Sequence, residues 1–271
     1  MINEKVSIIM GVYNCSQTID EAIGSILKQT YSDWEFIICD DFSTDNTYNK
    51  LLYYKENYPD KFVLLKNKKN FKLAYTLNRC LKYAKGRYIA RMDGDDISLP
   101  ERFEKQIKFL NNNPDMDLVG TSMRRFDDNG LADVLEAAKN PNKYTRRNRL
   151  PFYHATIMTY KYVYQELNGY TVSNRTIRVE DSDLWYRFYN AGFKGNNILE
   201  PLYLVREDIN SIKRRTFKVR WTGFRSTVRG YKLLGFPSYW LIRPFIKTLV
   251  KGLIPGWLVI KYRAMQKKNR G

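Results

Sequence analysis

The sequence is poor in the residues that usually bind zinc or form disulfides. Its 271 residues include one histidine, His154, and three cysteines, Cys15, Cys39 and Cys80, which show no CxxC spacing. This composition argues against a disulfide framework and a cysteine-rich zinc site, and it predicts buried, reduced thiols. The N-terminus shows no basic segment followed by an apolar one, so no secretory signal is visible. We therefore expect the catalytic portion to remain in the cytoplasm.

Acidic residues are missing from the C-terminal part of the chain. Residues 209–271 contain 16 lysines and arginines and no aspartate or glutamate, so this part accounts for most of the formal net charge of +18. No uncharged apolar run there reaches the roughly 18 to 20 residues that a membrane-spanning helix needs. Arg243, Lys247 and Lys251 recur every four residues, which on a helix places them in one stripe beside apolar residues.

We interpret residues 211–271 as a basic, amphipathic helical region that lies on the inner face of the cell membrane. Anionic lipids attract such segments by on the order of 1 kcal/mol per basic residue near the surface. Two alternatives remain, a helical pair packed on the preceding domain and an RNA-binding patch. The high aliphatic content disfavours the RNA alternative, so no nucleic acid is expected as a partner.

The preceding part alternates short apolar runs with stretches of helical periodicity. Repeated strand and helix units predict an α/β fold with a mostly parallel sheet, whose ligands lie beyond the carboxyl ends of its strands. Strands are predicted over Val6–Met10, Trp34–Cys39, Phe62–Leu65, Arg87–Met92 and Phe152–Tyr160 and near Leu118, and helices over Ser16–Gln29, Thr44–Tyr58, Leu73–Ala84, Glu101–Asn111 and Ser182–Ala191.

Three carboxylates are crowded where the fourth of these strands ends. Asp93, Asp95 and Asp96 occupy three of four consecutive positions, and the intervening Gly94 is flexible. Asp93 and Asp95 can therefore turn toward one point, and hard oxygen ligands of this kind suit Mn²⁺ or Mg²⁺ shared with a diphosphate. The alternative is a surface turn of solvated acids, because strand ends favour Asp and Gly.

Four segments, in this order, resemble the family 2 glycosyltransferases. They are Val6–Asn14, Gln29–Thr47, Asp93–Asp96 and Glu180–Trp185. The resemblance covers roughly residues 4–210 and implies a GT-A type fold, with sugar transfer from a nucleotide donor and inversion at the anomeric carbon. It implies a glycosyltransferase domain over residues 1–210, with a nucleotide-binding half over about 1–98 and an acceptor-binding half over 99–210, ahead of the membrane-associating region.

The resemblance assigns five residues to the nucleotide-sugar donor. Tyr13 would stack on the uracil of a UDP-sugar, although core packing is its alternative. Asn14 would shape the turn, and Asp41 would accept a hydrogen bond from the base. Asp93 would lie near the ribose, and Arg206 would contact a donor phosphate.

Further residues are assigned to the metal and to the donor phosphate. Asp95 would bind the metal directly, with Asp93 and His154 beside it, whereas a lone histidine is otherwise a bonded core residue. Lys72 stands where many relatives have glycine, and it either reaches a donor phosphate or is solvated.

On the acceptor side, Asp181 resembles the catalytic base of the family. Adjacent carboxylates raise each other's pKa toward a useful value, which the pair Glu180 and Asp181 would exploit. Glu180 would bind acceptor hydroxyls and Trp185 would form a sugar platform. The alternatives are an acidic helix N-cap and a tryptophan that fills the core.

The predicted function is metal-dependent, inverting transfer of one sugar to a glycan acceptor, with a polyprenyl-diphosphate-linked acceptor explaining the basic region. The setting would be assembly of capsule, O-antigen or exopolysaccharide. A sugar nucleotidyltransferase is disfavoured because no Gly-rich, basic phosphate loop follows the first strand. The other alternative is a non-catalytic basic adaptor for membrane or RNA on the same fold.

Overall fold

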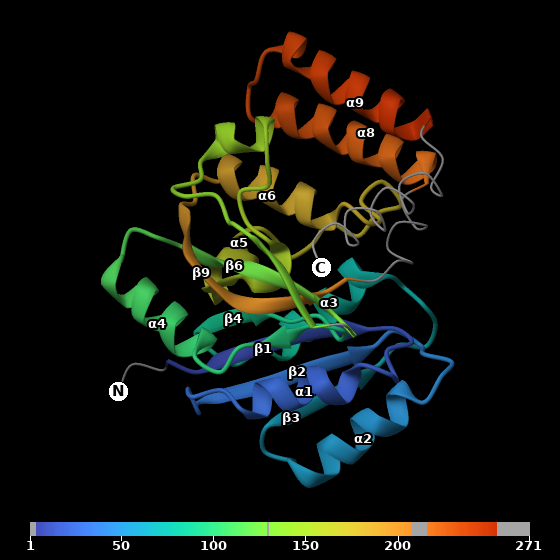
Figure 1. Ribbon diagram of the computed structural model, residues 1–271, viewed down its shortest axis with the longest axis vertical. Coiled ribbons are helices and arrows are strands. Elements are labelled where there is room, and N and C mark those ends of the chain that lie inside the picture. The colour runs from blue at the N-terminus through green and yellow to red at the C-terminus, as the bar shows by residue number, and fades with distance from the viewer. Residues whose placement is uncertain (1–3, 129, 208–215, 254–271) are drawn as a thin grey trace.

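The structure is a computed structural model that describes residues 4–128, 130–207 and 216–253. Its centre is a mixed sheet with the order β3-β2-β1-β4-β8-β6-β9-β5, and β7 pairs with β6 (Figure 1). The strands are β1 Val6–Val12, β2 Trp34–Asp40, β3 Phe62–Lys66, β4 Tyr88–Arg91, β5 Ile97–Ser98, β6 Leu118–Asp127, β7 Gly130–Leu135, β8 Met158–Tyr160 and β9 Gly195–Arg206.

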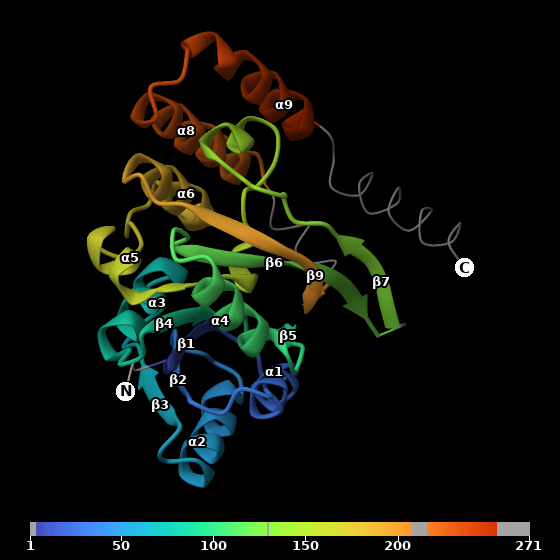
Figure 2. The same ribbon diagram turned by 90° about the vertical axis from the view of Figure 1, so that its left-hand side faces the viewer.

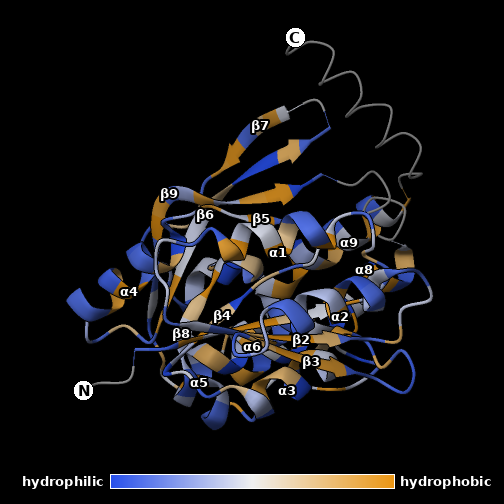
Figure 3. Ribbon diagram, turned by 90° about the horizontal axis from the view of Figure 1, so that it is seen from below, coloured by the Kyte–Doolittle hydropathy of each residue, from blue (hydrophilic) through white to orange (hydrophobic). Residues whose placement is uncertain are grey.

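The strands β3, β2, β1 and β4 are parallel and form the predicted first half of the sheet. Successive side chains of β1 enter opposite cores, with Ile8 and Met10 on one face and Ile9 on the other. One core includes α1 (Ile19–Leu27), α2 (Thr47–Asn57) and α4 (Arg102–Asn112), and the other includes α3 (Leu73–Tyr83), α5 (Lys161–Glu166) and α6 (Glu180–Asn190). Because both faces are covered, these strands are mostly apolar, as the hydropathy colours of Figure 3 show for the strands between the helices. Ser7, Glu35 and Arg91 are buried polar exceptions.

The second half of the sheet mixes directions. β8 is antiparallel to both β4 and β6, whereas β6 and β9 run parallel, and β5 is antiparallel to β9. The predicted strand over Phe152–Tyr160 is wrong in its first part, because His154–Thr156 forms a short 3-10 helix, η2, ahead of β8. The predicted helix Ser182–Ala191 begins earlier, at Glu180, which puts the acidic pair in its first turn.

Neighbouring parallel strands bring the polar clusters to one edge of the sheet. β2, β1 and β4 are adjacent, and the first two end directly before Asp41 and Tyr13. β4 ends at Arg91, two residues before the start of the segment Asp93–Asp96, which we call the acidic loop. The predicted location of the ligand site, beyond the carboxyl ends of these strands, therefore holds these residues together.

Two helices follow the sheet, α8 (Phe217–Leu233) and α9 (Ile242–Leu253), with the 3-10 helix η3 (Ser238–Leu241) between them. Figures 1 and 2 show α8 against α6 and α9 outside α8. Tyr186 of α6 packs on Tyr231 and Phe236, and the close contact at Gly230 leaves no room for a side chain. The alternative of a packed helical pair is therefore realised for α8.

No helix of the described residues combines the length and the hydropathy that crossing a membrane requires. The predicted stripe of Arg243, Lys247 and Lys251 does lie on one helix, α9. The break predicted at Pro255 lies outside the described residues.

Candidate functional site

The acidic loop is held by residues from the far end of the chain. The Arg206 backbone N–H donates to Oδ1 of Asp96 at 2.9 Å, and its Nε donates to the carbonyl of Asp95 at 3.1 Å. Asp96 is only 4% exposed, and burial together with the charges of Asp93 and Asp95 raises the pKa of its carboxyl well above the usual value. The three carboxylates therefore lie close enough to repel one another.

Arg91, which sequence reasoning missed, is the countercharge of the loop. Its guanidinium is almost fully buried and forms a salt bridge with Asp93, and it also donates to the carbonyl of Met92. An arginine in an apolar strand two residues before an aspartate was the available signal, because a buried cation needs a partner.

The predicted metal ligands could bind a divalent cation only if the protein supplied one or two carboxylates and the substrate supplied further ligands. The described residues contain no group of three His, Cys, Asp or Glu side chains arranged to hold a metal. Mg²⁺ and similar ions commonly use one or two protein carboxylates together with substrate phosphates. Asp93 and Asp95 supply such carboxylates. Burial raises the pKa of Asp96 most, the charges of Asp93 and Asp95 add to that rise, and a cation would relieve the part that these charges cause.

His154 lies near this centre but bonds within the protein. Its Nε2 is 2.8 Å from the hydroxyl of Tyr170, which lies 2.7 Å from the hydroxyl of Tyr164. Burial, reinforced by Arg91, lowers the pKa of His154 to about 3, while Asp93 opposes this shift. The imidazole is therefore neutral near pH 7, and only Nδ1 remains for a metal or a phosphate.

The nucleotide side of the edge combines an exposed ring with an ordered turn. Tyr13 is 47% exposed, so the alternative of core packing is excluded in this structure. Asn14 shapes the turn as predicted, because its Oδ1 accepts from the backbone N–H of Thr44 at 2.8 Å. Its φ of 53° is one that asparagine tolerates better than most residues.

The Asp41 carboxylate is hydrogen-bonded to a neighbouring loop and is not free to face a ligand with both oxygens. Its Oδ1 accepts from Asn67 Nδ2 at 2.6 Å and from the Phe71 N–H at 2.8 Å, and Oδ2 accepts from the Lys72 N–H at 2.9 Å. The carboxylate is 4% exposed, so the predicted hydrogen bond to a base would have to use the remaining capacity of Oδ2.

Arg206 is placed beside the acidic loop, as a donor-phosphate ligand should be. Its guanidinium also pairs with Glu21 and Asp128 and lies over the ring of Phe126, 4.4 Å from its centroid. A phosphate would compete with these carboxylates, so the role of Arg206 stays a prediction.

The two carboxylates in the first turn of α6 have different partners. Burial and the charge of Asp181 raise the pKa of Glu180 to about 7, and Arg91 acts in the opposite direction. Burial also raises the pKa of Asp181, opposed by the Ser182 N–H, which donates to Oδ1 at 2.7 Å, and by Arg146. The expected upward shifts are thus present, although burial contributes more than the neighbouring charge.

Arg146 is a second residue that sequence reasoning missed. It comes from the 3-10 helix η1 (Lys143–Arg147), and its Nη2 donates to Ser182 Oγ and to Tyr186 Oη, each at 3.2 Å. It therefore braces the turn that carries Asp181. A separation of 36 residues from Ser182 left no local signal in the sequence.

Trp185 corrects the prediction of an acceptor platform. The side chain is fully buried and packs among Phe152, Phe188 and His154, with ring centroids 5.2, 6.2 and 6.1 Å away. No face of the indole is open to a sugar. The alternative, that Trp185 fills the core, is the one that the structure supports.

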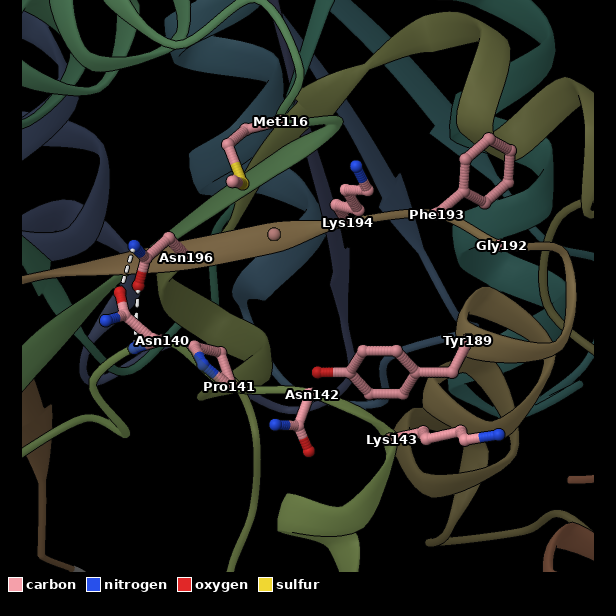
Figure 4. Close-up of a pocket in the computed structure, with 11 residues that line it drawn as sticks. Met116, Asn140, Pro141, Asn142, Lys143, Tyr189, Gly192, Phe193, Lys194 and Asn196 are labelled. Atoms are coloured by element: carbon pink, nitrogen blue, oxygen red, sulfur yellow. Dashed lines mark hydrogen bonds between the residues drawn. The ribbon is translucent and has the colours of Figure 1, made fainter.

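A separate hollow of about 320 Å³ lies at the other end of β9, beside Asn140, Tyr189 and Asn196 (Figure 4). β9 begins at Gly195 there and contacts the acidic loop through Tyr203 and Arg206, roughly 26 to 36 Å farther along the strand at about 3.3 Å per residue. No carboxylate lines this hollow, so it is not the centre at which the acidic residues meet.

Comparison with known proteins assigns this site to a family. The model of glycosyl transferase family 2 matches residues 7–185. The protein named "Putative glycosyltransferase EpsE" from Bacillus subtilis (strain 168) is 41% identical over 268 residues, which cover 98% of this chain and 95% of EpsE. The UDP-Glc:alpha-D-GlcNAc-diphosphoundecaprenol beta-1,3-glucosyltransferase WfgD from Escherichia coli is 45% identical over 105 residues, 39% of this chain and 40% of WfgD.

The solved structures include the mannosyltransferase PcManGT from Pyrobaculum calidifontis in complex with GDP-Man and Mn2+. It matches with a TM-score of 0.62 and 18% identity, over 96% of this chain and 79% of that one, which supports the fold alone. The chain has a GT-A fold, and it belongs to glycosyltransferase family 2.

Proposed function

We propose that this enzyme transfers a sugar from a nucleotide-diphosphate donor, with inversion, to a lipid-linked glycan acceptor in surface polysaccharide assembly. One observation carries the proposal. Arg91 pairs with Asp93 of the acidic loop, and its charge also opposes the rise in the pKa of Glu180, so one buried cation lies within electrostatic reach of both acidic groups. This proximity supports a single site for the donor-side and acceptor-side carboxylates, as a single displacement would require.

The donor that we propose is a UDP-sugar, with the exposed ring of Tyr13 as its stacking surface. Asn14 and Asp41 order the loops around that ring. The name of WfgD includes UDP-Glc, whereas PcManGT was solved with GDP-Man, so the base is best decided by assay.

Asp95 and Asp93 would hold Mn²⁺ or Mg²⁺, with His154 Nδ1 available beside them. When bound, such an ion supplies positive charge to the departing diphosphate. Arg91 and Arg206 belong to the protein itself and already offset part of the negative charge of the acidic loop. The complex of PcManGT with Mn2+ supports this choice of ion.

Asp181 would accept the proton of the acceptor hydroxyl as that oxygen attacks the anomeric carbon. A raised pKa improves it as a base, and Arg146 together with the Ser182 N–H opposes that shift and so favours the ionised form. Glu180, with a pKa of about 7, is partly protonated at neutral pH and can donate a hydrogen bond to an acceptor hydroxyl.

The acceptor and the location complete the proposal. A polyprenyl-diphosphate-linked acceptor is suggested by the printed substrate of WfgD and by the basic C-terminal region. We place the enzyme at the cytoplasmic face of the membrane, where α9 presents a basic and apolar surface. The pathway would build capsule, O-antigen or exopolysaccharide.

The test is release of nucleoside diphosphate from UDP-, GDP- and dTDP-sugars with Mn²⁺ or Mg²⁺. Asp95→Asn should abolish release while circular dichroism stays unchanged, because it removes a carboxylate from the predicted donor set. The matched control is Asp60→Asn, the same exchange at an exposed position between α2 and β3. Full activity in Asp95→Asn would remove that residue from the site, and failure of every donor to bind would contradict the proposed function.

A further inference from the structure

A groove runs along α9 on the side of η1 and η3. Its volume is about 510 Å³. We call it the α9 groove, and it is lined by the apolar or aromatic residues Tyr239, Trp240, Ile242, Pro244, Ile246 and Val250 and the basic residues Arg147, Arg243 and Lys247. No acidic side chain belongs to this lining.

The apolar wall of the groove faces solvent. Ile242 is 59% exposed, and Ile246 and Val250 are each 53% exposed. These residues follow one another at the spacing of a single helix face, so they form a continuous strip rather than scattered exposed side chains. Contiguous exposed apolar surface of this kind usually marks a binding site.

The charge of the groove points to an anion at the same place. The Arg147 guanidinium lies 4.4 Å from the centroid of the Trp240 ring, and Arg243 Nη1 donates to Asn148 Oδ1 at 2.5 Å. Residues 216–253 contain eight lysines and arginines and no acidic residue, so no carboxylate on these helices offsets that charge. A ligand that matches both walls carries a long apolar chain and a multiply charged anionic head.

The groove is connected to the proposed base through one short helix. Arg146 and Arg147 are neighbours on η1, yet Arg146 bonds to Ser182 beside Asp181 whereas Arg147 lines the groove. A ligand in the α9 groove would therefore place its head close to the acceptor side of the site.

We propose that the α9 groove binds the lipid end of the acceptor, an isoprenoid chain with its diphosphate. Arg147, Arg243 and Lys247 bind the diphosphate, and Trp240, Ile246 and Val250 contact the chain. The inference deepens the proposed function and rests on it. Two walls enclose a single chain, whereas a flat bilayer surface would engage the exposed basic residues of α8 equally.

The experiment uses the full chain and farnesyl diphosphate, a short isoprenoid diphosphate, in calorimetric titrations. Inorganic diphosphate and farnesol supply the head and the chain separately. Farnesyl diphosphate should bind at least about tenfold more tightly than either one, which corresponds to about 1.4 kcal/mol. Equal affinity for inorganic diphosphate would overturn the proposal, because it would leave a bare anion site.

Arg243→Glu with Lys247→Glu, the groove variant, should weaken farnesyl diphosphate binding by about tenfold or more, since both exposed cations become anions in the groove. Arg229→Glu with Lys232→Glu is the matched control, because it makes the same two exchanges at exposed positions of α8 outside the groove. Equal losses in the control and the groove variant would show attraction to general positive charge and overturn the proposal. Binding that persists in the groove variant, with its circular dichroism unchanged, would also overturn it.

Two further results separate this inference from the proposed function. Donor hydrolysis without farnesyl diphosphate binding would remove the groove and leave the transferase proposal intact. Binding of farnesyl diphosphate without any nucleotide-sugar binding would contradict the transferase proposal and leave the groove as a binding site. Phosphatidylglycerol vesicles test the bilayer as the ligand. If they bind as tightly as farnesyl diphosphate, and if Arg229→Glu with Lys232→Glu weakens vesicle binding as strongly as the groove variant does, a bilayer surface is the ligand and the proposal is overturned.

Discussion

The backbone of Lys72 offers a sharp test of the nucleotide side of the site. Lys72 has φ 73° and ψ 165°, a conformation that is almost confined to glycine and costs about 1–3 kcal/mol for other residues. Two contacts hold it there, since its N–H donates to Asp41 Oδ2 at 2.9 Å and its carbonyl accepts from the Thr76 N–H at 3.2 Å.

Replacing Lys72 by glycine should therefore stabilise the protein. Removing the backbone strain should raise the free energy of unfolding by about 1–3 kcal/mol. Glycine also gives the unfolded chain more freedom, which lowers that free energy by about 0.5–1 kcal/mol. The net gain is roughly 0 to 2.5 kcal/mol, with a midpoint of about 1 kcal/mol, and each kcal/mol raises Tm by about 2–4 °C in a protein of this size. Lys72→Ala removes the same amine but keeps the strained conformation, so it is the matched control.

Urea unfolding of the three proteins measures the difference directly. Lys72→Gly should have a higher midpoint than both Lys72→Ala and the unchanged protein, with the same slope. A glycine variant no more stable than the alanine variant would show that the backbone is not strained. Donor kinetics on the same samples decide the role of the amine, because loss of a phosphate contact would raise KM in both variants, whereas a solvated lysine would leave KM unchanged.

Two further variants test the surroundings of α6, the first at its acidic first turn and the second at its contact with α8. Arg146→Ala removes a positive charge that opposes the effect of burial on Asp181, so the pKa of Asp181 should rise. The acid limb of the kcat/KM profile should then move to higher pH, while the alkaline limb stays in place. Arg146→Lys should reverse part of this movement, and an unchanged pH profile would remove Arg146 from this role. Gly230→Ala should destabilise the packing of α8 on α6 by about 1–3 kcal/mol, because a Cβ there would lie 2.2 Å from the Tyr186 ring. Proteolysis should then release α8 before the sheet unfolds, and equal protection in both proteins would contradict the close packing.

The strands in the first half of the fold were predictable because each one has an apolar sequence that identifies it without reference to its partners. The strands β1, β2 and β4 are buried on both faces, and their sequences are therefore apolar runs with few interruptions, at Ser7, Glu35 and Arg91. β9 was not predictable in this way, because polar residues and Pro201 interrupt it and its pairing with β6 shifts register twice. Its identity as a strand comes from its partners rather than from its own pattern.

The residues of the candidate site also differ in whether a local stretch of sequence reveals them. Asp93 and Asp95 carry their signal in four adjacent residues, whereas the pairing of Arg146 with Ser182 appears only when distant elements meet. Trp185 shows the opposite error, since its type suggested a sugar platform while burial decided its role. Chemistry that depends on exposure or on long-range contacts is outside the reach of one sequence.

The contacts that hold the acidic loop also set the order in which the enzyme is completed during synthesis. The Asp93 N–H bonds the hydroxyl of Tyr203, and Asp96 bonds the backbone of Arg206, each across 110 residues. At about 5–20 residues per second, the ribosome needs roughly 5–20 s more to supply those partners after the loop itself has been made. A nascent chain that ends near Ser98 thus contains every carboxylate of the loop but none of the contacts from β9 that position them. Donor binding should appear late, when β9 joins the sheet, and the nucleotide-binding half should not work as a separate module.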